Sequence, residues 1–554
     1  MEHAVSFAGE KETIKTKEED TRMNQSLGIM LDCSRNGVMK PEKVKEFAKL
    51  IADMGYNMLQ LYTEETYEIL GEPFFGHMRG RYSQEELKDI DAYCSSIGVE
   101  LVPCIQVLAH LNQLTQWPIY APLFDCRDIL MVGEEKVYEL IEKMFQTLEE
   151  CFNTRRVNVG MDEAFFLGRG KYQDKHGYRD RVAILSEHLT RVKEIADRHG
   201  FSIMMWSDMF VRLHNDGEYY GDNITIPQET VDSVPEGVEL IYWDYYSKEK
   251  SHYDQMLVTH EAFHNPIAYA GGIWTWTGFA PNLRYTLEEI EAGMRSVREH
   301  PVADIIYTLW GDGGKECSYY ATLPALFAAA EMARGNFDRD DIAKKFEEKY
   351  GYTFGEFMNL ELPNITKEEE SHYHDPCKYL LYNDLFLGLY DFTVPADLPQ
   401  RYAEAAKILL KSVNGRKYDY LFETLGKLLS ALSKKCDLGI RLRKAYRAGD
   451  KELLRVLAEK EIPAVKDAVE AFAASFRKLW LRENKPFGLE VQENRMGGLL
   501  YRLESCRERI LAYLAGEIDK IDELEEESIA KYEDFKGEGI VYNDYATIVT
   551  ACVN

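Results

Sequence analysis

Short strand-like runs and helix-like segments alternate between residues 27 and 334, and this alternation limits the fold more than any other feature. Apolar runs rich in β-branched and aromatic residues predict eight strands, at 27–31, 57–62, 99–107, 155–160, 202–206, 238–243, 266–273 and 304–310. Segments with a helical spacing of apolar residues separate most of them, at 41–54, 83–96, 134–152, 180–199, 251–263, 286–299 and 323–334. Strands and helices in this order are typical of an α/β protein built as a (β/α)8 TIM barrel.

Local signals refine this barrel. Ser83 with Glu86, and Thr286 with Glu289, have the spacing of a capping box and so predict two helix starts. The stretch 207–237 is rich in Gly, Asn, Asp and Pro and shows no convincing helical pattern. We therefore expect one barrel helix to be missing or degraded.

Three regions are expected along the chain. Residues 1–25 form a charged N-terminal arm, residues 26–335 the barrel, and residues 336–554 an all-α C-terminal domain. Strand signals fade beyond 335, and segments with helical periodicity follow one another, at 340–350, 401–413, 418–446, 451–477, 495–515 and 518–532.

Charge and composition exclude several classes of partner. The 554 residues carry a formal net charge of −28, which would repel nucleic acid and anionic membrane surfaces. The sequence has no run of about 18 apolar residues, so we expect no transmembrane helix. Residues 1–22 are polar and include no apolar segment of a secretory signal, and the ten cysteines include no C-x-x-C pair. These features predict a cytoplasmic protein with reduced thiols.

Two adjacent carboxylates, Asp162 and Glu163, follow the strand at 155–160. An Asp-Glu pair alone is most often a solvated helix start. In a barrel, however, the carboxyl ends of the strands build the active site, and this pair stands at such an end. We therefore treat Asp162 and Glu163 as candidate catalytic residues.

Aromatic and charged residues gather at the other strand exits. Five of the seven tryptophans stand there or one residue beyond, interleaved with acids and one arginine. The candidates for substrate binding are Arg35, Glu65, His110, Trp206, Asp244, Trp274, Trp276, Trp310 and Asp312. Aromatic faces stack on sugar rings, and Asp and Arg bond sugar hydroxyls, so this set predicts a carbohydrate-active enzyme.

The carboxylates do not have the usual glycosidase arrangement. Most glycosidases place two carboxylates on opposite sides of the scissile bond. Here the seventh strand ends in Trp274-Thr275-Trp276 and offers no acid, and the second carboxylate is the neighbour of the first. Side chains of neighbouring strand residues diverge, so Asp162 and Glu163 cannot easily flank one bond.

These motifs resemble glycoside hydrolase family 20, the β-N-acetylhexosaminidases, and within it a bacterial cytoplasmic subgroup with a helical C-terminal domain. Asn158-Val159-Gly160-Met161-Asp162-Glu163 is similar to the family's His-x-Gly-Gly-Asp-Glu, with the histidine and second glycine replaced. Leu31-Asp32-Cys33-Ser34-Arg35 resembles its first-strand motif, Tyr242-Trp243-Asp244 its Tyr-x-Asp, and Trp310-Gly311-Asp312 its Trp-x-Glu. Trp206 stands where the family has a pocket-wall tryptophan.

The resemblance implies an exo-acting, retaining, substrate-assisted hydrolase that releases terminal GlcNAc, GalNAc or both from an oligosaccharide or glycoconjugate. Glu163 would be the general acid and base, and Asp162 would orient the substrate's own 2-acetamido group as nucleophile. Tyr242 would donate to the acetamido oxygen, and Arg35 would bind the sugar's 3- and 4-hydroxyls. The mechanism needs no metal and no organic cofactor.

The chain departs from the family at two places. The second strand ends in Glu64-Glu65 instead of Asp-Asp, and Leu108-Ala109-His110 replaces Pro-Gly-His. Glu65 and His110 are still expected in or behind the pocket. The alternatives are another substrate-assisted N-acetylglucosaminidase, of the kind that removes O-GlcNAc, and an inactive glycan-binding barrel.

The segment 480–502 is rich in turn and contact residues between long helices. Its apolar residues Leu489, Met496, Leu499, Leu500 and Tyr501 exceed what a solvent-facing helix needs. Two interpretations remain open. They form a homodimer through the helical domain, or they cover the flank of the barrel within one chain.

Overall fold

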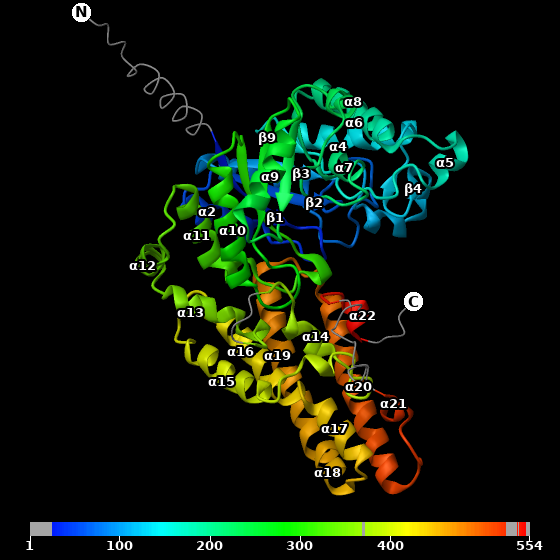
Figure 1. The fold of residues 1–554 in the computed structure, drawn as a ribbon, viewed down its shortest axis with the longest axis vertical. Coiled ribbons are helices and arrows are strands. Elements are labelled where there is room, and N and C mark those ends of the chain that lie inside the picture. Colours follow the sequence, from blue (N-terminus) through cyan, green and yellow to red (C-terminus); the bar gives the residue numbers. More distant parts are fainter. Residues whose placement is uncertain (1–24, 368–371, 528–539, 541, 550–554) are drawn as a thin grey trace, which may run out of the picture.

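Eight parallel strands close into a barrel in the computed structural model, which describes residues 25–367, 372–527, 540 and 542–549 (Figure 1). The strands are β1 Ser26–Asp32, β2 Met58–Glu64, β3 Glu100–Ile105, β6 Arg156–Asn158, β7 Ser202–Trp206, β8 Glu239–Asp244, β9 Ile267–Gly272 and β10 Asp304–Leu309. β1 pairs in parallel with both β2 and β10, which closes the barrel. The predicted TIM barrel is therefore confirmed.

Helices surround this barrel as the spacing of apolar residues predicts. They are α2 Pro41–Ala52, α3 Gln84–Ser96, α4 Glu135–Cys151, α6 Arg181–Arg198, α9 Lys250–Glu261, α10 Leu283–Val297 and α11 Leu323–Ala333. Between β7 and β8 the structure has only two short helices, α7 Asp208–Arg212 and α8 Gln228–Ser233, so the barrel helix expected to be degraded is indeed reduced.

One predicted helix start is confirmed and the other is wrong. Ser83 and Glu86 form a complete capping box at the start of α3. The helix α10 instead begins at Leu283, and Thr286 lies inside it with its hydroxyl bonded to the carbonyl of Asn282. Glu289 is fully buried behind β9, where the amide of Gly272 donates to it at 3.4 Å. The spacing of Thr286 and Glu289 therefore does not mark the start of a helix.

Helices make up the described chain beyond the barrel. They are α12 Arg339–Tyr350, α13 Phe354–Met358, α14 Pro376–Tyr382, α15 Leu398–Lys411, α16 Asp419–Lys435, α17 Leu438–Arg447, α18 Lys451–Val456, α19 Ile462–Glu483, α20 Leu489–Ala515, α21 Asp522–Glu525 and α22 Tyr545–Val549. None of the helices in the described ranges combines the length and apolar composition that crossing a membrane requires.

Several helix limits differ from the prediction. The segment 418–446 is broken between α16 and α17, and a π-helical turn at Leu457–Glu461 interrupts 451–477. The predicted helix at 518–532 is wrong where it is described, because only Asp522–Glu525 is helical there. The rest of it lies outside the described residues, as does nearly all of the N-terminal arm 1–25.

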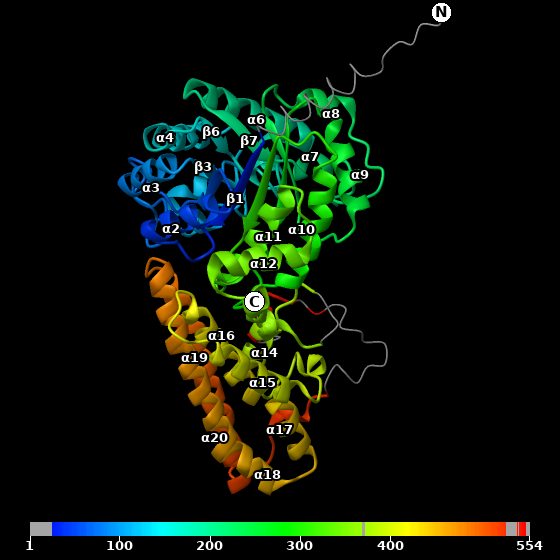
Figure 2. The same cartoon turned by 90° about the vertical axis from the view of Figure 1, so that its left-hand side faces the viewer.

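The two longest helices connect the helical region to the barrel. α19 and α20 lie side by side and run from the far end of the helical region to the carboxyl ends of the barrel strands (Figures 1 and 2). At their junction Asn484 forms a β-bridge with Met39, and Lys485 forms an ion pair with Glu86 at 2.6 Å. The segment 480–502 therefore packs on the barrel.

The apolar residues of this segment are largely covered within the chain. Leu489, Met496 and Leu499 are buried, and Leu500 packs partly buried against the core. Only Tyr501 is open to solvent, with 80% of its surface exposed. Packing within one chain accounts for the apolar surplus, and the homodimer stays a prediction.

Candidate active site

Asp162 and Glu163 stand at the exit of β6 on a backbone with unusual torsion angles. Gly160, Met161 and Glu163 all have positive φ, at 72°, 72° and 52°. This left-handed region is costly for residues other than glycine, and such strain concentrates at functional sites. The turn brings both carboxylates to the carboxyl end of the barrel, as the sequence predicts.

The side chain of Gln106, which directly follows β3, forms hydrogen bonds to this turn. Its side-chain oxygen accepts from the amide of Met161 at 3.1 Å, and its nitrogen donates to Oδ1 of Asp162 at 2.7 Å. A Cβ on Gly160 would lie 2.1 Å from the Gln106 oxygen, so only glycine fits there. Gln106 was not among the predicted site residues, although a polar residue directly after a barrel strand is a usable signal.

His110 connects the two carboxylates with Arg35. Its Nε2 lies 3.2 Å from Oδ2 of Asp162 and 3.7 Å from Oε2 of Glu163, while Nδ1 lies 3.3 Å from Nη2 of Arg35. The His110 amide is held by Asp128 at 3.0 Å. Burial alone would lower the pKa of His110, but the charge of Asp162 and the bond to it outweigh burial and raise the pKa to about 9.

The pKa values of the two adjacent carboxyl groups are pushed apart. Burial favours the neutral acid at Asp162, but the charge of His110 and bonds from His110 and Gln106 outweigh it and lower the pKa of Asp162. Burial, followed by the charge of Asp162, raises the pKa of Glu163. One group therefore favours the carboxylate and the other retains its proton to higher pH, which is the arrangement that separates an electrostatic role from an acid role.

Asp208 and Arg212 support Glu163 from the other side, on α7. Oδ2 of Asp208 accepts from the Glu163 amide at 3.1 Å and from Nε of Arg212 at 3.1 Å. The Arg212 guanidinium then lies 3.9 Å from Oε1 of Glu163. Burial and the nearby Asp162 raise the pKa of Asp208 to about 7. Neither residue was among the predicted site residues.

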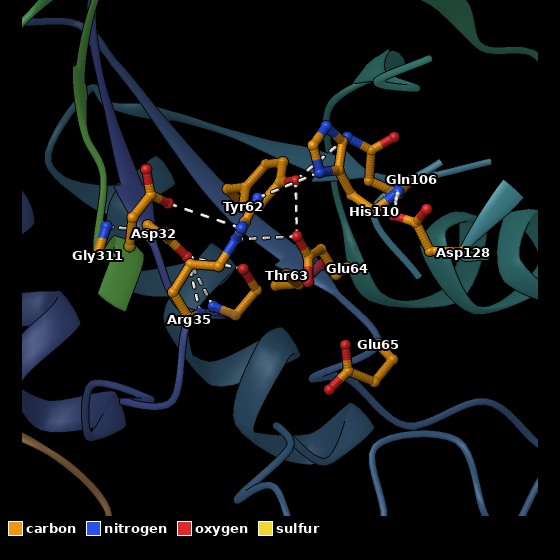
Figure 3. A network of polar contacts seen from close by, with 12 residues as sticks. Asp32, Arg35, Tyr62, Thr63, Glu64, Glu65, Gln106, His110, Asp128 and Gly311 are labelled. Atoms are coloured by element: carbon orange, nitrogen blue, oxygen red, sulfur yellow. Dashed lines mark hydrogen bonds and ion pairs between the residues drawn. The ribbon is translucent and has the colours of Figure 1, made fainter. Parts of the chain in front are cut away.

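Arg35 points into the same space from the loop after β1. Figure 3 shows its guanidinium between His110 and Glu64, with the Glu64 Oε1 atom 3.1 Å from Nε. The Asp312 carboxylate lies 3.7 Å from Nη1 of Arg35 and remains about half exposed. Asp32 ties the loops together, because its oxygens accept from the amides of Arg35 and Gly311 at 3.2 and 2.8 Å. Arg35 and Asp312 thus offer a paired donor and acceptor.

Glu65 is not where the sequence places it. Its carboxylate is buried and paired with Nε of Arg79 at 2.8 Å, away from the pocket (Figure 3). The reason is local, because Glu64 has a φ of 44° and the register between β2 and β3 shifts at this point. The turn directs Glu64 to Arg35 and sends its neighbour to the opposite side. Glu64 therefore takes the position expected of Glu65.

Aromatic rings line the walls of the pocket. The residues that surround it together are Arg35, His110, Asp162, Glu163, Trp206, Trp243, Tyr245, Tyr246, Trp276, Trp310 and Asp312. Trp206, Trp243, Trp276 and Trp310 are among the five tryptophans predicted at the strand exits, whereas Tyr245 and Tyr246 were not predicted there. Trp274 stands behind the wall, stacked on Trp276 with ring centres 4.0 Å apart.

Tyr242 and Asp244 are turned away from the pocket. Both are fully buried, and the Tyr242 hydroxyl donates to Asp244 at 2.8 Å while Asp244 also contacts His252 of α9 at 2.7 Å. Alternate residues of a strand face opposite sides, so Trp243 and Tyr245 point inward instead. The geometry does not support the predicted roles of Tyr242 and Asp244 in contact with substrate.

Tyr245 and Tyr246 both line the pocket, and Tyr245 is the buried one of the two. Its side chain lies beside Thr308 and Trp310. Burial raises the pKa of Tyr245 well above its usual range, so its hydroxyl keeps its proton.

Hexosaminidases from other organisms are similar to parts of this chain. Human hexosaminidase D is 24% identical over 217 residues, covering 37% of this chain and 42% of that protein, and bovine hexosaminidase D is 24% identical over 257 residues, covering 43% and 68%. The alignment thus spans less than half of the human relative. The solved β-N-acetylhexosaminidase of Bacteroides fragilis aligns at 19% identity over 59% of this chain and 69% of that chain, with a TM-score of 0.46.

Two family models match successive parts of the chain. Residues 27–249 match the glycosyl hydrolase family 20 catalytic domain, and residues 354–542 match the glycoside hydrolase 20C C-terminal domain. The first match covers the strand exits that carry Arg35, His110, Asp162, Glu163 and Trp206. Both models describe one family, and the chain belongs to glycoside hydrolase family 20.

Proposed function

We propose that the protein is an exo-acting, retaining β-N-acetylhexosaminidase that uses the acetamido group of its substrate as nucleophile. The observation that carries this proposal is the opposite pKa displacement of Asp162 and Glu163, combined with a β9 exit that offers no carboxylate. The other carboxylate that lines the pocket, Asp312, is paired with Arg35 at the exit of β10, so we assign it to sugar binding and not to nucleophilic attack. The nucleophile must then come from the substrate, as one of the known exceptions to the two-carboxylate scheme allows.

Each group would act at a stated atom. Glu163 protonates the glycosidic oxygen as the bond to the anomeric carbon breaks, and later removes a proton from the attacking water. Asp162, held ionised by His110 and Gln106, accepts from the acetamido N–H and stabilises the positive charge that develops in the oxazolinium ring. The acetamido oxygen forms the new bond to the anomeric carbon, so the water that follows restores the original configuration.

Tyr245 takes the role that the sequence analysis gives to Tyr242. Its hydroxyl keeps its proton and lines the pocket, so it would donate to the acetamido oxygen and align it for attack. The rings of Trp206, Trp276 and Trp310 form the walls against which the sugar packs.

Arg35 and Asp312 would bind hydroxyls of the terminal sugar. A guanidinium and a carboxylate 3.7 Å apart match the donor and acceptor character of neighbouring hydroxyls. Their contact across the exits of β1 and β10 leaves the acid Glu163 for the leaving-group side. This favours removal of one terminal residue at a time over cleavage within a chain.

Hydrolysis of p-nitrophenyl N-acetyl-β-glucosaminide and the corresponding galactosaminide tests the function. We expect release of nitrophenol and tighter inhibition by a thiazoline mimic of the oxazolinium than by N-acetylglucosamine itself. A 2-fluoro glycoside should leave no covalent sugar on the protein. A sugar ester on any Asp or Glu in mass spectrometry would disprove the substrate-assisted mechanism, and failure to hydrolyse either glycoside would favour an inactive glycan-binding barrel.

A further inference from the structure

The loop after β10 carries Asp312 on a backbone that needs external support. Three consecutive residues have positive φ, Gly313 at 72°, Gly314 at 133° and Lys315 at 59°. The left-handed conformation is strained at Lys315, because this residue, unlike glycine, has a Cβ atom. The loop therefore depends on contacts that select this conformation over less strained ones.

Those contacts come from the helical region, more than sixty residues away in sequence. Gln492 on α20 donates to the carbonyl of Gly314 at 2.9 Å, and Arg495 on the same helix donates to the carbonyl of Gly313. Glu316 at the end of the loop lies 3.0 Å from both Lys378 of α14 and Arg495. We call Lys378, Gln492 and Arg495 the loop clamp.

Glycine at two loop positions makes this close approach feasible. A Cβ on Gly314 would lie 2.5 Å from the Gln492 nitrogen and 2.6 Å from the Arg495 guanidinium. A Cβ on Gly313 would lie 2.8 Å from Nζ of Lys378. A side chain at either glycine would displace the clamp side chains from these contacts, and the positive φ at both positions would add strain.

The same helix start also reaches the loop that carries Arg35. The side chain of Asn36 donates to the carbonyl of Gly488 at 2.8 Å and to that of Gly314 at 3.3 Å. Gly488 has a φ of 86°, and a Cβ there would lie 2.2 Å from the Asn36 carbonyl. Asn36 thus joins the β1 loop, the β10 loop and the N-terminus of α20 at one point.

The chemistry of the clamp indicates that it specifies geometry. The side chains of Lys378 and Glu316 are fully buried. A buried ion pair loses most of its attraction to desolvation and is often no more stabilising than an apolar pair of the same size. A fully buried amide at Gln492 adds cost as well, since its oxygen has no hydrogen-bond partner in the described structure.

We propose that Lys378, Gln492 and Arg495 are positioning residues for sugar binding, and that the helical region completes the pocket by fixing the loops of Asp312 and Arg35. This rests on the proposed function, because it assumes that Asp312 and Arg35 bind the terminal sugar. None of the three clamp residues is among those that line the pocket. The clamp acts through the backbone carbonyls of Gly313 and Gly314 and through Glu316.

The test compares variants on one helix. Gln492→Leu and Arg495→Met remove clamp contacts, and Arg502→Met is the matched control because Arg502 pairs with Asp384 at 2.6 Å within the helical region. For each we would measure kcat, KM, Tm and amide hydrogen exchange of residues 311–316. We expect KM for the nitrophenyl N-acetylglucosaminide to rise about 5- to 20-fold in the clamp variants, the equivalent of one or two lost hydrogen bonds. Loop exchange should quicken in them, and Arg495→Lys should recover part of both effects.

The control separates positioning from general stability. Arg502→Met should lower Tm by a similar amount and leave KM and loop exchange unchanged. Clamp variants that lower Tm alone, or a control that raises KM equally, would overturn the proposal. If the wild-type protein hydrolyses no N-acetylhexosaminide, the proposed function fails, and hydrogen exchange of the loop still decides whether the clamp holds it.

Discussion

The exit of β6 and the exits of β1 and β10 meet in one pocket but obtain their support from different parts of the chain. Asp162 and Glu163 are held by Gln106, His110 and Asp208, all of which belong to the barrel region. Arg35 and Asp312 stand on loops that contact α14 and the start of α20. If the proposed mechanism holds, proton transfer is supported by the barrel itself, and sugar binding depends in part on the helical region.

Substitutions that affect the two sides of the pocket should therefore have different kinetic effects. A change in the helical region can reach KM through the β10 loop while the acid pair stays in place. A change at Gln106 or Asp208 alters the acid pair directly. The two sides should therefore separate in kinetics, with losses in kcat on the β6 side and losses mainly in KM on the side of β1 and β10.

Removal of the acid should have the largest effect. Glu163→Gln cannot donate a proton, so the rate on substrates with poor leaving groups should fall by roughly two to four orders of magnitude. The loss should be far smaller when the leaving group needs no proton, as with a dinitrophenolate. Equal losses on both substrate types, measured as kcat/KM, would show that Glu163 is not the acid.

Neutralisation of Asp162 should be almost as damaging but should not depend on the leaving group. Asp162→Asn removes the charge that stabilises the oxazolinium, at a cost of about two to three orders of magnitude in kcat. Progressive fluorination of the acetamido methyl group should also slow the wild-type enzyme. A rate insensitive to fluorination would contradict participation of the acetamido group.

On the binding side, Arg35→Ala should reduce kcat/KM by about a hundredfold through the loss of charge-assisted bonds to sugar hydroxyls.

The adjacent glutamates Glu64 and Glu65 provide a paired comparison beside Arg35. Glu64→Gln weakens the partner of Arg35 and should raise KM, whereas Glu65→Gln acts only at Arg79 and should leave KM unchanged. The reverse pattern would restore the sequence-based assignment of Glu65.

The glutamates and tyrosines show where sequence reasoning succeeds and fails. Strand and helix periods, together with the order of motifs, predict the barrel and place Asp162, Glu163, Arg35, His110 and several tryptophans correctly at its carboxyl end. Successive residues of a strand face opposite sides of the sheet, so a motif match that is shifted by an odd number of residues places a side chain on the wrong side. Tyr242 and Tyr245 are three residues apart and lie on opposite faces, and the motif selected the one that faces away from the pocket.

Other features had no local signal. The register shift at Glu64 depends on pairing between β2 and β3, and the π-helical turn at Leu457–Glu461 depends on packing between helices. The clamp joins Gly314 to Gln492, and neither residue type is distinctive in its own segment. Such contacts arise only when distant segments meet, so periodicity and short motifs cannot predict them.

The tyrosine assignment can be tested by two variants of equal chemistry. Tyr245→Phe removes a protonated hydroxyl from the pocket wall and should reduce kcat by about tenfold, the value of roughly one good hydrogen bond. Tyr242→Phe removes a hydroxyl that bonds only Asp244 behind the wall and should change kcat little. Both variants bury similar rings, so differences in folding, checked by Tm, should be small. A larger loss in Tyr242→Phe would reverse the assignment.

The smallest expected effect is a shift in pH dependence at the acid side. The alkaline limb of kcat/KM reports the pKa of the free enzyme's general acid, which we propose to be Glu163. Burial and the charge of Asp162 raise that pKa, while His110 and Arg212 lower it. Arg212→Met removes a cation that stabilises the Glu163 carboxylate, so the pKa should rise and the alkaline limb should move to higher pH. Asp162→Asn should move it to lower pH.

Arg127→Met is the control for this shift, because the Arg127 guanidinium stacks on the Phe166 ring at 4.2 Å, beside the same loop. Arg212 also pairs with Asp208, which holds the Glu163 amide, so Asp208→Asn is needed as a second comparison. If the shift arises from the cation, it should appear in Arg212→Met and be absent from Arg127→Met. A limb that moves to lower pH in Arg212→Met would assign the titration to another group and would weaken the case for Glu163 as the acid.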